Sequence, residues 1–126
     1  HPKLYSEATK TDFMFDMKGK KILLLSARVI PEMFQEFQEK SGISKDTVDY
    51  IIPHQASRAL PLVMEKLGVP DYKYLNIVSD YGNMVSVAVP FGLAYALDHG
   101  YVKEGDTIFL IGTAAGMTVN MLALKL

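Results

Sequence analysis

The sequence predicts an α/β domain, and three observations support that prediction. Stretches with apolar residues at helical spacing alternate with short apolar runs of the length expected for buried strands. Two of these runs end in polar strings, Pro53-His54-Gln55-Ala56 and Tyr81-Gly82-Asn83, which lie about one βαβ unit apart. The last two runs flank a short loop, as an antiparallel pair of strands does. In an open α/β sheet, groups just past the carboxyl ends of strands face the ligand crevice.

The N-terminal part divides into a polar arm and a long helix. Residues 1–12 are polar without periodic signal and predict an arm or loop, so the domain is expected over residues 13–126, with a short strand at 13–17. Apolar residues then recur at helical spacing: Ile22, Leu25, Val29, Met33 and Phe37. Pro31 predicts a kink or a junction of two helices because it lacks an amide hydrogen, and Gly42 predicts the stop.

Two strands are expected to deliver the polar strings. Val48–Ile52 predicts a buried strand that ends beside His54, and Tyr74–Val78 predicts the strand that precedes Asn83. Between them, Ser57 predicts the N-cap of a helix. That helix has an apolar stripe closed by a glycine: Leu60, Val63, Met64, Leu67 and Gly68.

The C-terminal part predicts one more helix and two strands. Residues 85–99 are apolar nearly all round, which is typical of a central, buried helix, and Gly100 closes it. Gly105-Asp106 predicts a turn. Strands are expected at Thr107–Ile111 and Val119–Leu124, with an antiparallel pairing between them.

Composition narrows the function classes. A chain of 126 residues, 49% of them hydrophobic, suffices for one domain with its own core. Its net charge of −1 gives no support to nucleic-acid binding. The absence of cysteine excludes disulfides, and it excludes thiolate chemistry by this chain alone.

The compartment follows from the same reading. No apolar run reaches the ~18–20 residues needed to span a bilayer, and no signal peptide is recognised, so we expect a cytoplasmic protein without a membrane partner. The chain begins at His1 rather than a methionine, so we expect a fragment or a processed product. His1 and His99 are scattered, and their spacing predicts no metal site.

His54 and Asn83 are the candidate functional pair. The topology brings one imidazole and one carboxamide from neighbouring strand ends into one space, where both can donate hydrogen bonds to a developing negative charge. The ordinary pKa of histidine is about 6.5, so a modest shift keeps it neutral at pH 7. From the residues alone, two other interpretations stay open: His54 as a structural histidine, and Asn83 as a turn residue beside Gly82.

Three motifs together resemble one family. They are Ile52-Pro53-His54-Gln55-Ala56, Tyr81-Gly82-Asn83 followed by a helix containing Pro90, and Gly105-Asp106 leading to Gly112-Thr113-Ala114-Ala115-Gly116. Their order and spacing resemble the C-terminal half of 3-oxoacyl-(acyl-carrier-protein) synthase III. The resemblance covers about residues 13–126 and includes Met17-Lys18-Gly19. It implies the C-terminal half of a thiolase-like fold, a mixed sheet flanked by helices.

The resemblance implies a decarboxylative Claisen condensation in fatty acid biosynthesis. In that family, a cysteine in the other half of the molecule takes an acyl group from coenzyme A, and a malonyl thioester on acyl carrier protein loses carbon dioxide and attacks it. His54 and Asn83 match the residues that hydrogen-bond the malonyl thioester carbonyl. The isolated chain is expected to be inactive because it contains no cysteine.

The implied partners follow from that reaction. They are acyl carrier protein, a coenzyme A thioester as substrate, and an N-terminal half that carries the cysteine, within a homodimer. No permanently bound cofactor is implied.

Further contacts are implied by position. The family carries three glycines near the cysteine, and a backbone N–H there helps to hold the acyl oxyanion. Here the stretch is Ala114-Ala115-Gly116, so that role falls on Ala115 or Gly116 if the φ angle is allowed for alanine, and a plain hairpin loop is the alternative. Coenzyme A or carrier-protein contact is expected at five positions: Gly19, Lys20, Ala56, Ser57 and Arg58. Ser57 stands where the family most often has asparagine.

The lysines around Gly19 have two interpretations. Lys18, Lys20 and Lys21 can attract phosphates or an acidic carrier protein, or they can form a solvated face. Two rival functions stay open for the whole chain. One is a non-catalytic thiolase-like module that binds coenzyme A or acyl carrier protein, and the other is a secondary-metabolism condensing enzyme with another acyl acceptor.

Overall fold

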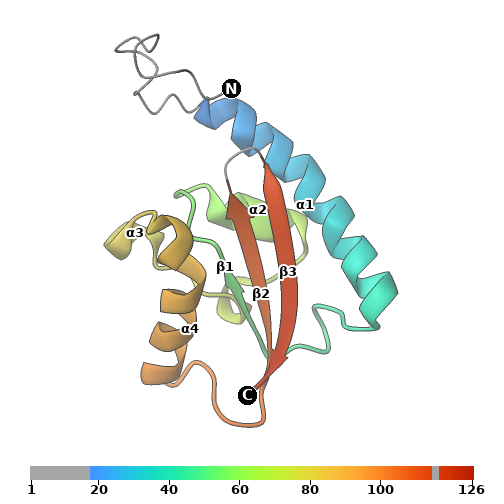
Figure 1. Cartoon of the computed structure of the whole chain (residues 1–126), viewed down its shortest axis with the longest axis vertical. Helices are drawn as coiled ribbons and strands as arrows, with labels where there is room; N and C mark the ends of the chain where they lie inside the picture. Colours follow the sequence, from blue (N-terminus) through green and yellow to red (C-terminus); the bar gives the residue numbers. More distant parts are fainter. Residues whose placement is uncertain (1–17, 115–116) are drawn as a thin grey trace, which may run out of the picture.

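A mixed sheet with helices on both faces forms the structure (Figure 1), a computed structural model that describes residues 18–114 and 117–126. The sheet has three strands in the order β1-β2-β3. Strand β1 (Tyr50–Pro53) runs parallel to β2 (Thr107–Ala114), and β2 runs antiparallel to β3 (Thr118–Lys125). The predicted mixed α/β sheet is therefore confirmed. The expected arm at 1–12 and short strand at 13–17 lie outside the described residues.

The predicted strand at Tyr74–Val78 is wrong. Tyr74 forms a single parallel bridge to Ile51, and the Leu75 N–H donates to the Ile51 carbonyl at 3.0 Å. The chain then turns into the short helix α3 (Val78–Tyr81) instead of continuing along the sheet. The physical reason lies in β1, because its last residue, Pro53, has no N–H with which to extend the ladder.

One face of the sheet, which we call the α1/α2 face, is covered by α1 (Gly19–Ser41) and α2 (Leu60–Lys66). Phe34 of α1 meets Phe109 of β2 edge-on, with ring centroids 5.3 Å apart. Figure 1 shows α2 behind the sheet, whereas α1 passes the end of the sheet at which β2 ends and β3 begins. This face holds the larger of the two groups of buried apolar side chains.

Two predicted helix features are wrong and one is confirmed. Of the two outcomes expected at Pro31, the junction of two helices is wrong: α1 runs through Pro31 as one element, and its buried residues Ile30 and Phe34 lie on both sides of the proline. Helix α2 begins at Leu60 rather than after Ser57, whose hydroxyl instead accepts the Ala59 N–H at 3.2 Å in a turn that precedes the helix. Gly42 ends α1 in the left-handed conformation at φ 71°, as predicted.

The opposite face, which we call the α4 face, is covered by α4 (Ala88–Asp98), preceded by the 3₁₀ turn η4 (Val85–Val87). A line of small residues, Ala88, Gly92 and Ala96, brings the helix close to the sheet. A Cβ on Gly92 would lie 2.9 Å from Cγ2 of Ile52, so only glycine fits without a shift of the core.

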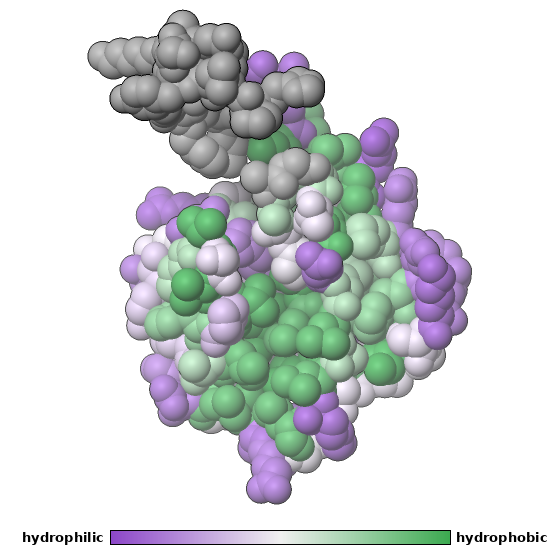
Figure 2. Space-filling view, in the orientation of Figure 1, coloured by the Kyte–Doolittle hydropathy of each residue, from purple (hydrophilic) through white to green (hydrophobic). Residues whose placement is uncertain are grey.

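The expectation that this helix is buried all round is wrong for the described chain. Only the line of small residues is buried, and Leu97 at the end of α4 is 44% exposed. The apolar character extends over sides of the helix that no other described element covers. Figure 2 shows a broad apolar surface over the region of the sheet in the same orientation. Within the described ranges, no helix combines the length and the apolar character that a bilayer span requires.

Candidate active site

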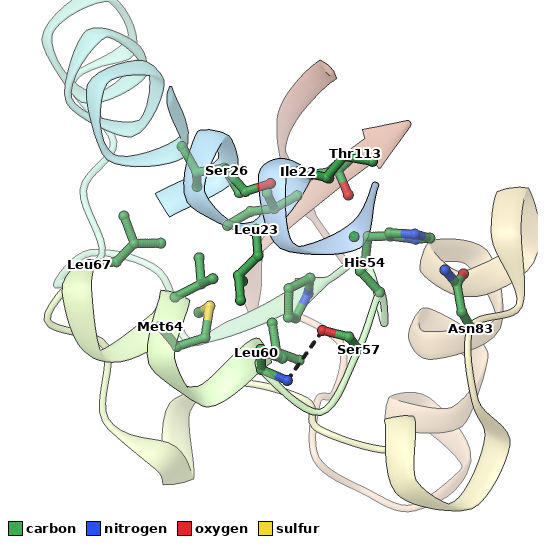
Figure 3. A pocket seen from close by; sticks show the side chains of 17 residues that line it. Ile22, Leu23, Ser26, His54, Ser57, Leu60, Met64, Leu67, Asn83 and Thr113 are labelled. Carbon is green, nitrogen blue, oxygen red and sulfur yellow. Dashed lines mark hydrogen bonds between the residues drawn. The ribbon is translucent and has the colours of Figure 1, made fainter. Parts of the chain in front are cut away.

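His54 is held at the end of β1 by the strand ladder. Its N–H donates to the Ile111 carbonyl of β2 at 2.7 Å, which continues the parallel ladder one residue past Pro53. The backbone is thus fixed at the carboxyl edge of the sheet, where the sequence places it. The imidazole is half-buried and points out of the strand end towards the Asn83 loop (Figure 3).

The environment of the His54 ring favours its neutral form. Burial lowers the pKa of His54 below its ordinary value of 6.5, because the charged form loses hydration. No protein partner for the His54 ring nitrogens is present in residues 18–114 and 117–126. A neutral imidazole with one N–H available can donate a hydrogen bond to a ligand oxygen without first losing a proton.

The Asn83 side chain is oriented by its own loop. Its Oδ1 accepts the Val85 N–H at 2.9 Å, so the acceptor end of the carboxamide is used within the loop. The Nδ2 group is left as the donor on the side that faces His54 (Figure 3). Val85 adopts φ 54°, an unfavourable region for a β-branched residue, and its N–H is the donor that holds Asn83 Oδ1.

Gln55 was assigned no role by the sequence analysis, yet it joins the two parts of the site. Its side chain is completely buried, and its Nε2 donates to the carbonyls of Pro53 at 2.9 Å and Leu75 at 3.0 Å. Its Oε1 accepts the Ile77 N–H at 2.9 Å. The available signal in the sequence was a carboxamide at the end of a fully apolar strand, a position where a polar side chain needs buried partners.

A cavity of about 160 Å³ opens beside the two donors. His54 and Asn83 line one part of it, and α1 and α2 supply the apolar remainder. The apolar lining is formed mainly by Ile22, Leu23, Ile30, Leu60, Val63, Met64 and Leu67. A second cavity, of about 300 Å³, lies on the α4 face and is also lined by His54. His54 therefore stands where the cavities of the two sheet faces meet.

The structure places some of the expected contact residues at the first cavity. Gly19, Ala56 and Ser57 line it, whereas Lys20 and Arg58 are exposed and are not among the lining residues. The expected backbone donors, Ala115 and Gly116, lie outside the described residues. The described part of the chain contains no group of three or more histidine, aspartate or glutamate side chains able to hold a metal ion.

The mixed sheet, its two helical layers and the placement of His54 at the end of β1 and of Asn83 in the loop after α3 are those of the C-terminal half of a thiolase-like fold. Residues 38–126 match the family described as 3-oxoacyl-[acyl-carrier-protein] synthase III C terminal. The chain belongs to this family. The His54 and Asn83 motifs lie within the matched range.

Known proteins agree with this assignment. The chain is 33% identical to the beta-ketoacyl-[acyl-carrier-protein] synthase III of Clostridium perfringens over 88% of its length, and this covers 35% of that relative. The crystal structure of 3-oxoacyl-[acyl-carrier-protein] synthase III from Aquifex aeolicus matches with a TM-score of 0.81 and 32% identity, covering 88% of this chain and 36% of that one. The corresponding Thermus thermophilus structure matches over 100% of this chain and 39% of its own, with a TM-score of 0.84 and 28% identity. The chain thus spans about a third of the length of the relatives it matches.

Proposed function

We propose that this chain is the C-terminal part of an acyltransferase that condenses an acyl group, taken from coenzyme A, with a malonyl thioester on acyl carrier protein in fatty acid biosynthesis. The observation that supports this most strongly is the convergence of two neutral donors, His54 and Asn83, beside an apolar cavity. Membership of the synthase III family supports the same reaction class.

In the proposed reaction, the bond between the malonyl α-carbon and its carboxylate breaks and carbon dioxide leaves. The electron pair passes into an enolate whose negative charge lies on the thioester oxygen. The His54 ring N–H and the Asn83 Nδ2 group donate hydrogen bonds to that oxygen, where their fixed dipoles stabilise the charge. The enolate carbon then attacks the acyl-cysteine carbonyl, and the cysteine sulfur leaves as a thiolate.

Substrate binding is assigned to the first cavity and its rim. Gly19, Ala56 and Ser57 line the cavity, so an extended thioester arm would pass between them. Lys20 and Arg58 are exposed cationic side chains that can attract the phosphates of coenzyme A or an acidic carrier protein. Ala115 or Gly116 would supply the backbone donor for the acyl oxyanion.

The cysteine must come from an N-terminal half, because this chain has none. Exposed apolar side chains on the α4 face favour a further protein layer over it. On this face Leu122 is 56% exposed and Val87 is 54% exposed. Without that half, we expect the chain to bind but not to turn over substrate, and we expect the whole enzyme to be a homodimer.

The test uses the full-length protein. Incubation with an acyl-coenzyme A should add one acyl mass at the cysteine, and a malonyl thioester should then be decarboxylated. His54→Ala and Asn83→Ala should each lower the decarboxylation rate by about 10²–10³ while acylation of the cysteine continues. His99→Ala and Asn76→Ala, which alter the same residue types at exposed positions, serve as matched controls.

Each alternative has its own outcome. Loss of acylation with decarboxylation preserved would contradict the roles given to His54 and Asn83. Binding of coenzyme A thioesters without any acyl adduct would identify a non-catalytic module. An adduct that reacts only with a different acceptor would identify a condensing enzyme of another pathway.

A further inference from the structure

Gln55 is the one polar residue that the described part of the chain buries among its core side chains, with 0% of its surface exposed. All its hydrogen bonds are made to backbone groups, namely the carbonyls of Pro53 and Leu75 and the N–H of Ile77. The carboxamide orientation is unambiguous, since only the oxygen can accept from Ile77 and only the nitrogen can donate to the two carbonyls. A buried side chain whose hydrogen-bonding groups all have partners restricts the motion of the backbone segments that it joins.

These partners are the groups that a longer parallel ladder would join directly. The ladder reaches its last rung where Leu75 N–H meets the Ile51 carbonyl. The next rung would pair a Pro53 N–H with the Leu75 carbonyl, and the Ile77 N–H with the Pro53 carbonyl. Because Pro53 has no N–H, the Gln55 carboxamide inserts between the two segments and bonds to each of the groups left over.

The insertion connects both halves of the candidate site. On one side, the residue before Gln55 is His54, whose N–H is anchored to Ile111. On the other side, the Ile77 carbonyl accepts the N–H groups of Asp80 and Tyr81 at 3.1 Å. The Gly82 N–H then bonds to Val78 at 2.9 Å, directly before Asn83. A continuous series of hydrogen bonds thus runs from Gln55 through α3 to the Asn83 loop.

We propose that Gln55 is a positioning residue that sets the separation of the His54 and Asn83 donors by holding the Ile77 segment one carboxamide away from β1. This inference rests on the proposed function, because the separation matters only if both donors bind one substrate oxygen. Gln55 is completely buried and lines neither cavity, so it would act on a substrate only through the two donors. A purely structural glutamine would support folding without setting the donor geometry.

The first variant is Gln55→Glu in the full-length protein. When ionised, its carboxylate sets an oxygen against the carbonyls of Pro53 and Leu75, and the segments move apart. We expect kcat for malonyl thioester decarboxylation to fall about 10²-fold above neutral pH, with KM and cysteine acylation little changed. As the pH is lowered, the protonated carboxyl regains one donor, so kcat should recover in part, whereas the Gln38→Glu control should show neither effect.

The second variant separates stability from positioning. Gln55→Ala removes the link, and adding Pro53→Ala supplies the missing N–H, which can then donate directly to the Leu75 carbonyl. The double variant should regain much of the thermal stability lost in Gln55→Ala, while kcat stays low because the Ile77 segment now lies too close to β1. Recovery of kcat together with stability would show that Gln55 is merely structural and would overturn the proposal.

A parallel His54→Ala variant keeps the two hypotheses apart. If His54→Ala retains decarboxylation, the proposed function fails. If His54→Ala loses decarboxylation but Gln55→Glu matches the Gln38→Glu control at every pH, only the positioning role fails. Should Gln55→Glu not fold above neutral pH, the comparison of the two alanine variants decides the question.

Discussion

The two faces of the sheet are built from the same strands in different ways. Along β2, Phe109 and Ile111 are buried on the α1/α2 face, whereas Ile108 and Leu110 point to the α4 face. The α1/α2 face is closed by large side chains, with the Phe37 and Phe109 rings 4.8 Å apart. The α4 face is covered by one helix that approaches through small residues and leaves apolar side chains in solvent.

The difference in packing indicates that the α1/α2 face mainly stabilises the fold, whereas the α4 face is suited to contact with a further protein layer. Large interlocking side chains on the α1/α2 face remove much apolar surface from water and stabilise the fold. Exposed apolar residues on the α4 face retain surface that a further protein layer can bury. The candidate site lies between the two, since His54 lines cavities on both faces.

The largest effect of a substitution on the free energy of unfolding is expected on the α1/α2 face. Phe109→Ala removes a ring that is 1% exposed, and it should lower the free energy of unfolding by about 3–5 kcal/mol because a cavity is left behind. Chemical denaturation of the chain measures this directly. A loss under about 1 kcal/mol would mean that the α1/α2 face repacks freely and that the contrast between the faces is false.

A smaller effect is expected at the Asn83 loop. Val85 is 72% exposed and holds φ 54°, so Val85→Gly relieves backbone strain and should raise the free energy of unfolding by about 1 kcal/mol. The same change loosens the N–H that orients Asn83, so decarboxylation should fall even though stability rises. Parallel gains in stability and rate would show that this conformation does not serve the site.

The effect of pH should be seen at the boundary between the faces. The pKa of His54 is lowered below 6.5 in the folded chain, so the unfolded chain takes up a proton first as the pH falls. The stability that His54 contributes is therefore complete above pH 6.5 and is lost as the pH falls through the lowered folded value. Measuring the free energy of unfolding as a function of pH should show this loss of stability below pH 6.5. His54→Gln should remove the pH dependence, and the control His99→Gln should leave it in place.

The smallest effect on the free energy of unfolding of this chain is expected on the α4 face. Leu122→Ala changes a residue that is 56% exposed and should alter the unfolding free energy by no more than about 0.5 kcal/mol. In the full-length protein, the same change should cost about 2–5 kcal/mol if a covering half buries the side chain. Equal effects in both would show that this face stays open, contrary to the proposed N-terminal layer.

Much of this architecture is determined by the sequence alone. Periodicity identified α1 and the β2–β3 pair, since a buried stripe and a buried strand both need apolar residues at a regular spacing. The turn at Gly42 was readable because glycine adopts the left-handed conformation without strain. The position of His54 at a strand end followed from the apolar run before it.

Only the tertiary structure decided the remainder, because those features depend on partners distant in the chain. The predicted strand at Tyr74–Val78 does not form because the Gln55 side chain makes the hydrogen bonds that Pro53 cannot make. Its partners Leu75 and Ile77 lie 20 and 22 positions further along the chain. Three-dimensional placement also decided that α4 presents a line of small residues to the sheet and keeps apolar sides open. The orientation of the Asn83 carboxamide depends on its hydrogen bond from the Val85 N–H, and Val85 itself adopts a positive φ that no propensity of valine predicts.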